Sequence, residues 1–230
     1  MERSNLHHVM FDIDGTLLKS YDLDSRCFID SIKFVTGVCV DTNWSKYRHV
    51  TDSGILEEII DVNEIINKQE TMKKVKSVFI EKLEQSIANE PIQEVPGAAE
   101  FLTLLNSMSD VVVSLATGGW YESAALKLSS VGIDFSSIPL ASSTDNISRT
   151  EIMKTAVSRI PNGKDFPCTY FGDGSWDKEA CEQMGFNFVL VGNRLIHKPN
   201  ITNFLSIDEA MACIGFYTDL KNSERYVLRK

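Results

Sequence analysis

The chain has 230 residues and a net charge of −9 at pH 7, with 43% hydrophobic and 24% charged residues. This length suits one sizeable core with a smaller inserted unit. The acidic balance argues against general binding to nucleic acid or to an anionic membrane, because both need a basic surface, so we expect neither as a partner.

The cysteines and the N-terminus bear on the cellular compartment. Five cysteines are scattered along the chain, and no pair has the Cys-x-x-Cys spacing, so the sequence predicts neither a disulfide framework nor a zinc site. No signal-peptide pattern opens the chain, and no apolar run approaches the ~20 residues that span a bilayer. We therefore expect a reduced, cytoplasmic protein, and the sequence leaves a monomer and a homodimer equally open.

Short apolar runs alternate with helical patterns along most of the chain. The runs at 8–11, 111–115, 169–171 and 186–191 are rich in β-branched and aromatic residues and predict buried strands. A weaker run at 138–141 contains Pro139, which suits a sheet edge. Helical patterns lie at 96–108, 121–131, 149–160, 176–184 and 206–214. This alternation predicts an α/β fold, a Rossmann-like parallel sheet with helices on both faces.

The segment between Ser20 and Glu94 differs from the rest of the chain. It has few strand signals, and its helical periodicity falls at 25–35, 53–66 and 70–87. Prolines between 91 and 96 suggest a linker where this segment ends. We therefore predict a helical unit at 18–94, inserted after the first strand of an α/β core formed by 1–17 and 95–230.

Asp12 and Asp14 directly follow the first predicted strand. Carboxylates two residues apart point the same way on an extended chain, and the carboxyl end of a parallel strand faces the crevice where such sheets bind ligands. Two carboxylates held close together need a cation or a shared proton. One can then act as a nucleophile and the other can carry protons. The alternative is an Asx turn assisted by Gly15.

Two further polar clusters follow predicted strands. Thr117 and Gly118 offer a hydroxyl and backbone N–H groups where a helix begins, which suits an anion, although a simple helix cap gives the same pattern. Asp173 and Asp177 offer hard oxygen ligands of the kind that Mg²⁺ prefers, with helix capping as the alternative. Because all these strands belong to one predicted sheet, we expect the clusters to converge at one edge.

The order Asp-x-Asp-Gly-Thr, then Thr-Gly, then Gly-Asp-x-x-x-Asp resembles the haloacid dehalogenase-like superfamily. The resemblance covers residues 1–17 and about 95–195. The helical insert looks like the C1 cap of the phosphoglycolate phosphatase and β-phosphoglucomutase-like branch. Dehalogenases lack the second aspartate and phosphonatases carry alanine there, so Asp14 points to phosphate esters.

The resemblance implies a role for each motif residue. Asp12 is the expected nucleophile and a Mg²⁺ ligand. Asp14 is the expected acid and base, and its backbone carbonyl also binds the metal. Thr117 and the N–H of Gly118 are expected to hold phosphate oxygens. Asp173 is an expected metal ligand, and Asp177 is expected to bind the metal directly, through water, or to orient its ligands.

The sequence departs from the family at the basic residue. The family has a lysine, usually followed by proline, before the helix that follows the third strand, and no Lys-Pro occurs here. We favour Arg149 over Lys154 for this role, because Arg149 stands where the helix begins and a guanidinium can bind phosphate and bridge carboxylates. A solvated residue at the helix start is the alternative for Arg149.

Residues of the helical unit are expected to contact the substrate. Arg48, His49 and Thr51 are the candidates, in a basic and polar stretch before a predicted helix. A solvated turn with an N-cap explains the same stretch equally well. Tyr21, Asp22 and Asp24 follow the first motif closely and are candidates to line the entrance of the pocket. Trp120 is a candidate for the pocket wall, with a place in the core as the alternative.

The sequence thus favours a Mg²⁺-dependent phosphatase that hydrolyses a small phosphorylated metabolite through an aspartyl-phosphate. Two alternatives remain. One is a phosphomutase of the β-phosphoglucomutase type, and the other is a catalytically idle binding or regulatory protein with the same fold.

Overall fold

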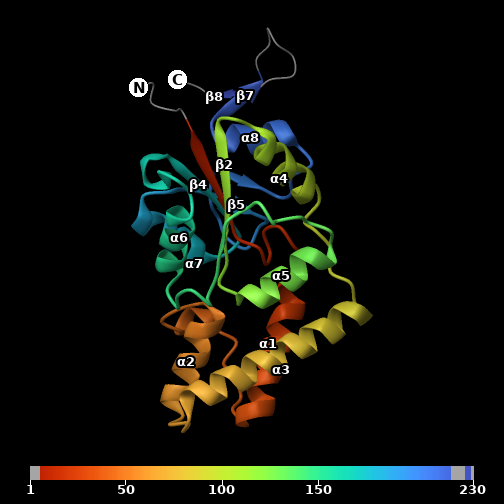
Figure 1. The fold of residues 1–230 in the computed structure, drawn as a ribbon, viewed down its shortest axis with the longest axis vertical. Helices are drawn as coiled ribbons and strands as arrows, with labels where there is room; N and C mark the ends of the chain where they lie inside the picture. The colour runs from red at the N-terminus through yellow and green to blue at the C-terminus, as the bar shows by residue number, and fades with distance from the viewer. Residues whose placement is uncertain (1–5, 219–225, 229–230) are drawn as a thin grey trace.

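The computed structural model describes residues 6–218 and 226–228. Its centre is a parallel six-stranded sheet with the order β3-β2-β1-β4-β5-β6 (Figure 1). The strands are β1 (His7–Phe11), β2 (Val111–Ala116), β3 (Leu140–Ala141), β4 (Cys168–Gly172), β5 (Asn187–Val191) and β6 (Asn200–Ile201). β1 lies between β2 and β4, so the loops that follow these three strands are neighbours.

Helices cover both faces of this sheet, which confirms the predicted fold class. On one face α4 (Ala98–Ser107), α5 (Tyr121–Ser130) and α8 (Ile207–Cys213) pack over a core in which Phe11 stacks on Phe171 with ring centroids 4.9 Å apart. On the other face α6 (Arg149–Ser158) and α7 (Ser175–Met184) pack against the sheet. Buried apolar strands of this kind need a helical cover on each side.

A separate helical layer lies beyond the carboxyl edge of the sheet, at the bottom of Figure 1. It contains α1 (Tyr21–Thr36), the 3₁₀ helix η1 (Trp44–Lys46), α2 (Asp52–Val62) and α3 (Lys68–Asn89). These helices share a hydrophobic cluster that includes Phe28 and Phe79. The two connections to the sheet run side by side, because Lys19 N–H donates to Gln93 C=O at 2.8 Å and Val95 N–H to Leu17 C=O at 2.7 Å.

Several element bounds differ from those predicted. α1 begins at Tyr21 rather than Ser25, and α2 ends at Val62, before Glu64 and Asn67 adopt positive φ values of 52° and 62°. β6, the 3₁₀ helix η2 (Gly163–Asp165) and an antiparallel pair of β7 (Phe216–Thr218) and β8 (Tyr226–Leu228) were not predicted. These elements are too short to produce a periodic pattern.

β3 has only two residues and lies at the sheet edge, the position that Pro139 suggested. All five cysteines are free, and Cys168 and Cys181 are buried. Within the described ranges, no helix combines the length and apolar character needed to cross a membrane.

Candidate active site

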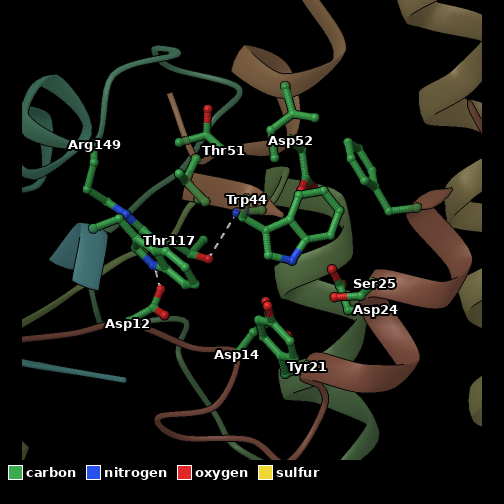
Figure 2. Close-up of a pocket in the computed structure, with 16 residues that line it drawn as sticks. Asp12, Asp14, Tyr21, Asp24, Ser25, Trp44, Thr51, Asp52, Thr117 and Arg149 are labelled. Carbon is green, nitrogen blue, oxygen red and sulfur yellow. Dashed lines mark hydrogen bonds and ion pairs between the residues drawn. The ribbon is translucent and has the colours of Figure 1, made fainter. Parts of the chain in front are cut away.

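The strand-end clusters converge at the carboxyl edge of the sheet. Asp12 follows β1, Thr117 follows β2, and Asp173 follows β4. Asp12 N–H donates to Phe171 C=O at 2.9 Å, which continues the ladder between β1 and β4 up to the site. Figure 2 shows Asp12, Asp14 and Thr117 around one pocket, with Arg149 reaching toward Asp12.

Three carboxylates gather beneath this pocket. Asp12, Asp173 and Asp177 each offer an oxygen, and these atoms all lie within 4.8 Å of one another. The three residues are 3%, 2% and 0% exposed. Burial raises the pKa of Asp12 well above its usual range, raises that of Asp177, and raises that of Asp173 to about 7. Such a cluster favours a bound cation, because a cation offsets both the burial and the mutual repulsion.

Hydrogen bonding supports a metal site at this cluster. Neither side-chain oxygen of Asp173 has a hydrogen-bond partner within the described chain, although Oδ2 lies 3.1 Å from Arg194 Nη1. Buried polar atoms are normally paired, so Asp173 Oδ1, which has neither a hydrogen bond nor an ion pair among the described residues, indicates an additional ligand. Three hard oxygen donors fit Mg²⁺, which binds a few carboxylates and retains several waters.

Gly15 allows Asp173 to lie close to the loop that follows β1. It has a φ of +83°, and a Cβ atom at this position would lie 2.1 Å from Asp173 Oδ2. Only a residue without a side chain combines this left-handed conformation with so close a contact. Gly15 of the first motif therefore has a steric role in the carboxylate cluster, beyond the turn geometry expected from the sequence.

Arg149 is the basic residue at the site. Its Nη1 lies 3.3 Å from Asp12 Oδ1, and its Nε lies 3.3 Å from Asp177 Oδ1. Burial lowers the pKa of Arg149, but Asp177 and Asp12 more than offset this, so the pKa is raised overall. Lys154 instead pairs with Glu151 at 2.6 Å on the surface. The structure thus brings Arg149, and not Lys154, to Asp12.

Asp14 is bound by a lysine that the sequence interpretation missed. Lys127 Nζ lies 2.7 Å from both Asp14 oxygens and also bonds Asp24, while Ser20 Oγ donates to Asp14 at 2.5 Å. The Lys127 side chain is fully buried. Burial lowers the pKa of Lys127, but Asp14 and Asp24 raise it further, so this residue stays charged. The only sequence signal was a lysine within the helical pattern 121–131, where solvent exposure is the usual case.

The phosphate-loop residues lie where the motif predicted. Thr117 is buried and lines the pocket together with Gly118. Its Oγ1 accepts a hydrogen bond from Gly119 N–H at 3.1 Å. Gly118 C=O accepts one from Asp52 N–H at 2.8 Å, which ties this loop to the start of α2. The phosphate loop and the helical layer therefore meet directly at the pocket.

The candidates from the helical layer separate into two groups. Thr51 lines the pocket, but its hydroxyl is engaged: it accepts from Gly54 N–H at 3.1 Å as the N-cap of α2 and donates to Ile147 C=O at 2.8 Å. Arg48 and His49 line a neighbouring depression and do not line the pocket that contains Asp12. The structure therefore places only Thr51 of these three at the pocket.

Other residues of the layer line the same pocket as Asp12. Tyr21 and Asp24 line the pocket, as do Asp52 and Trp44, which the sequence interpretation did not single out. Asp22 is exposed. A further aromatic residue, Trp120, packs into the helical layer, with its ring centroid 5.7 Å from Phe28 and 5.4 Å from Phe79.

Comparison with known proteins identifies the family. Residues 9–191 match the model of the haloacid dehalogenase-like hydrolase family. The chain belongs to this family. The predicted resemblance is thereby confirmed, and the match includes both the strand-end motifs and the helical layer. No curated protein sequence matches the chain.

Solved structures of several relatives share the fold of this family member. β-Phosphoglucomutase from Clostridium difficile has a TM-score of 0.68 at 16% identity, covering 91% of this chain and 97% of its own. CbbY from Rhodobacter sphaeroides, solved with phosphate, has a TM-score of 0.66 at 14% identity, covering 88% and 96%. A hydrolase from Pseudomonas syringae has a TM-score of 0.66 at 19% identity, covering 83% and 87%. At these identities the likeness shows the fold alone.

Proposed function

We propose that this protein is a Mg²⁺-dependent phosphatase that hydrolyses a small phosphorylated metabolite through an aspartyl-phosphate on Asp12. One observation carries the proposal. Asp12 is buried at a strand end, within 4.8 Å of two further carboxylate ligands and 3.3 Å from a guanidinium nitrogen. Phosphoryl transfer depends mainly on positioning and on neutralising phosphate charge, and these groups provide both.

Asp12 and Asp14 divide the chemistry. An Asp12 oxygen attacks phosphorus, the bond from phosphorus to the leaving oxygen breaks, and Asp14 gives that oxygen a proton. Asp14 then takes a proton from water, the water oxygen attacks phosphorus, and the bond to Asp12 breaks to release inorganic phosphate. Ser20 and Lys127 orient Asp14 at the wall of the pocket for these transfers.

The remaining site residues bind the phosphate and the metal. Arg149, the Thr117 hydroxyl and the Gly118 N–H hold phosphate oxygens in the proposed complex. Mg²⁺ would be held by the carboxylates of Asp12, Asp173 and Asp177 with the backbone carbonyl of Asp14, and when bound it supplies charge neutralisation for the phosphate.

The helical layer is, in this proposal, a cap that covers the phosphate and excludes bulk water. Four hydrogen bonds join the start of α2 to loops of the core: Thr51 to Ile147, Asp52 to Gly118 and to Trp120, and Ser53 to Ser143. The domain bounds 18–94, the cytoplasmic location and the choice between monomer and homodimer stay predictions.

Two measurements separate this proposal from its alternatives. Hydrolysis of p-nitrophenyl phosphate with Mg²⁺ should fall at least about 10³-fold in Asp12→Asn, because the amide is not a nucleophile. Asp22→Asn, at an exposed position of α1, is the matched control and should retain the wild-type rate. Equal rates for wild type and Asp12→Asn would contradict the proposal and favour an idle binding protein. A phosphomutase would instead require a bisphosphate activator for efficient turnover of its substrate.

A further inference from the structure

The charges around the pocket are unevenly distributed. Of the described residues that line it, four are acidic and Arg149 is the one basic side chain; the acids are Asp12, Asp14, Asp24 and Asp52. Arg149 is already engaged by Asp12 and Asp177 on the side of the phosphate. The part of the pocket that would hold the leaving group therefore has carboxylates from α1 and α2, and no further basic side chain is among its described lining residues. Arg194 lies behind this lining, where it stacks on the Tyr21 ring with its Cζ 3.5 Å from the ring centroid and pairs with Asp173.

Lys127 does not correct this imbalance. It lies behind the pocket wall, where its single charge is shared between Asp14 and Asp24. Asp52 has no ion pair among the described residues, and its surroundings include these same carboxylates. A second phosphate or a carboxylate on the leaving group would face this negative field without a counter-charge, which disfavours its binding.

Asp52 lines the pocket and has one side-chain oxygen without a hydrogen bond among the described residues. The residue is 9% exposed and lies at the first position of α2, where its Oδ2 accepts from Trp120 N–H at 3.0 Å. Within the described chain its other side-chain oxygen makes no hydrogen bond, yet it is not sealed from the cavity that Asp52 lines. Burial raises the pKa of Asp52 well above its usual range, so a cation beside it would restore the ionised form.

Aromatic rings complete the surroundings of this carboxylate. Tyr21, Phe28, Trp44 and Trp176 line the same pocket, and of these the Tyr21 ring already stacks on the Arg194 guanidinium. Figure 2 shows Trp44 in its middle, with Asp14, Asp24 and Asp52 labelled around it. Rings and carboxylates together are the surroundings that stabilise an organic ammonium group, through cation–π contacts and charge-assisted hydrogen bonds.

We propose that the substrate is a phosphorylated amino alcohol whose ammonium group is bound by Asp52 against the ring of Trp44. This rests on the proposed phosphatase function and specifies its substrate class. Hydrolysis then releases the amino alcohol and inorganic phosphate. The pocket selects for the ammonium by attraction to Asp52 and against an anionic leaving group by repulsion.

Three esters that differ only in their terminal group test this proposal. They are 2-aminoethyl phosphate, 2-hydroxyethyl phosphate and phosphoglycolate, whose ends are cationic, neutral and anionic. For the wild-type enzyme with Mg²⁺ we expect kcat/KM to fall at least about tenfold at each step of this order, which corresponds to about 1.4 kcal/mol or more. The first step loses the ion pair with Asp52, and the second adds repulsion between two negative groups. A preference for phosphoglycolate, or equal values for all three, would overturn the proposal.

Asp52→Asn locates the selectivity. The asparagine keeps an oxygen for Trp120 N–H but removes the charge, so the ratio of kcat/KM for the aminoethyl ester over the hydroxyethyl ester should fall at least about tenfold. Asp22→Asn, an exposed carboxylate on α1, should leave this ratio unchanged. An unchanged ratio in Asp52→Asn would contradict the assignment of the ammonium to Asp52.

A binding measurement on the wild-type protein covers the case in which Asp52→Asn does not fold. Calorimetry should show tighter binding of 2-aminoethylphosphonate than of phosphonoacetate, and the reverse order would overturn the proposal.

The phosphatase proposal and the amino-alcohol proposal would be contradicted by different results. Asp12-dependent hydrolysis of p-nitrophenyl phosphate with a preference for anionic esters would remove the amino-alcohol proposal alone. Absence of hydrolysis of every ester would remove the phosphatase proposal and the substrate class that rests on it.

Discussion

The two sides of the pocket balance their charges in different ways. On the sheet side, Asp12 and Asp177 share Arg149, and the orphaned oxygens of Asp173 leave room for a metal. On the helical side, Lys127 is fixed within the wall by Asp14 and Asp24, and Asp52 keeps an oxygen free. The sheet side is thus arranged for an anion and the helical side for a neutral or cationic group. If the two proposals hold, reaction type and substrate choice depend on different residues.

The largest predicted effect concerns the buried lysine of the helical side. Lys127→Met keeps the volume but leaves Asp14 and Asp24 without their cation, and we expect the free energy of unfolding to fall by about 3–5 kcal/mol at pH 8. Burial already raises the pKa of Asp24 to about 6 despite Lys127, so the loss should be smaller at pH 5. Chemical denaturation measures both values.

Lys154→Met is the matched control for this substitution. Lys154 is 56% exposed and pairs with Glu151 on the surface, so its loss should change stability by less than about 0.5 kcal/mol. Equal destabilisation by the two substitutions would mean that the ion pairs of Lys127 contribute little.

On the sheet side, Arg149→Met should lower kcat/KM for p-nitrophenyl phosphate by about 10²–10³-fold, because a positioned cation next to the transferring phosphate is lost. Steady-state kinetics at saturating Mg²⁺ measure this. Lys154→Met should remain within about twofold of wild type, since that residue lies away from Asp12. The opposite outcome would assign the basic role to Lys154.

Magnesium binding should weaken as the pH falls. Burial raises the pKa of Asp173 to about 7, so below this pH the metal competes with a proton, and the apparent Kd should rise about tenfold per pH unit. In the metal-free protein a lower pH instead increases the free energy of unfolding. The stabilisation from protonated Asp173 is complete below about pH 4 and is lost as pH rises through 7. Thermal melts with and without Mg²⁺ at pH 5.5–8 test both trends. A Kd independent of pH would contradict them.

The smallest effect concerns two glycines with similar backbones. Gly15 and Gly37 have φ values of +83° and +76°, but an added Cβ meets Asp173 at 2.1 Å only at Gly15 and meets nothing within 4 Å at Gly37. Both alanine substitutions incur the left-handed cost of about 1–2 kcal/mol. Gly15→Ala should cost roughly 1 kcal/mol more and should weaken Mg²⁺ binding, while Gly37→Ala should leave the metal affinity unchanged. Equal effects would show that Asp173 moves aside freely.

The sheet side could be predicted because its residues follow strands. Asp12, Thr117 and Asp173 come directly after apolar runs, and parallel pairing brings the ends of neighbouring strands together. Arg149 was identified from its place at a helix start despite the absent Lys-Pro. The fold class followed from the same alternation of strands and helices.

The helical side could not be predicted in the same way. Lys127 and Asp24 meet across more than 100 residues of sequence, and a lysine within a helical pattern resembles an exposed one. Asp52 reaches the pocket because the start of α2 is hydrogen-bonded to Gly118 and Trp120, and Trp44 reaches it from the hydrophobic cluster of the helical layer. Arg48 and His49 were predicted from their chemistry and from the place of this segment in C1-capped relatives, but they line a neighbouring depression.

The most direct test of the central claim is to trap the phosphoryl group on the protein. Wild type mixed with substrate and Mg²⁺ is quenched in acid within the first turnover, and the digested peptides are read by mass spectrometry. The account predicts one added phosphoryl group on the peptide that contains Asp12, and none in Asp12→Asn. A phosphoryl group on another residue, or turnover by Asp12→Asn at the wild-type rate, would contradict it.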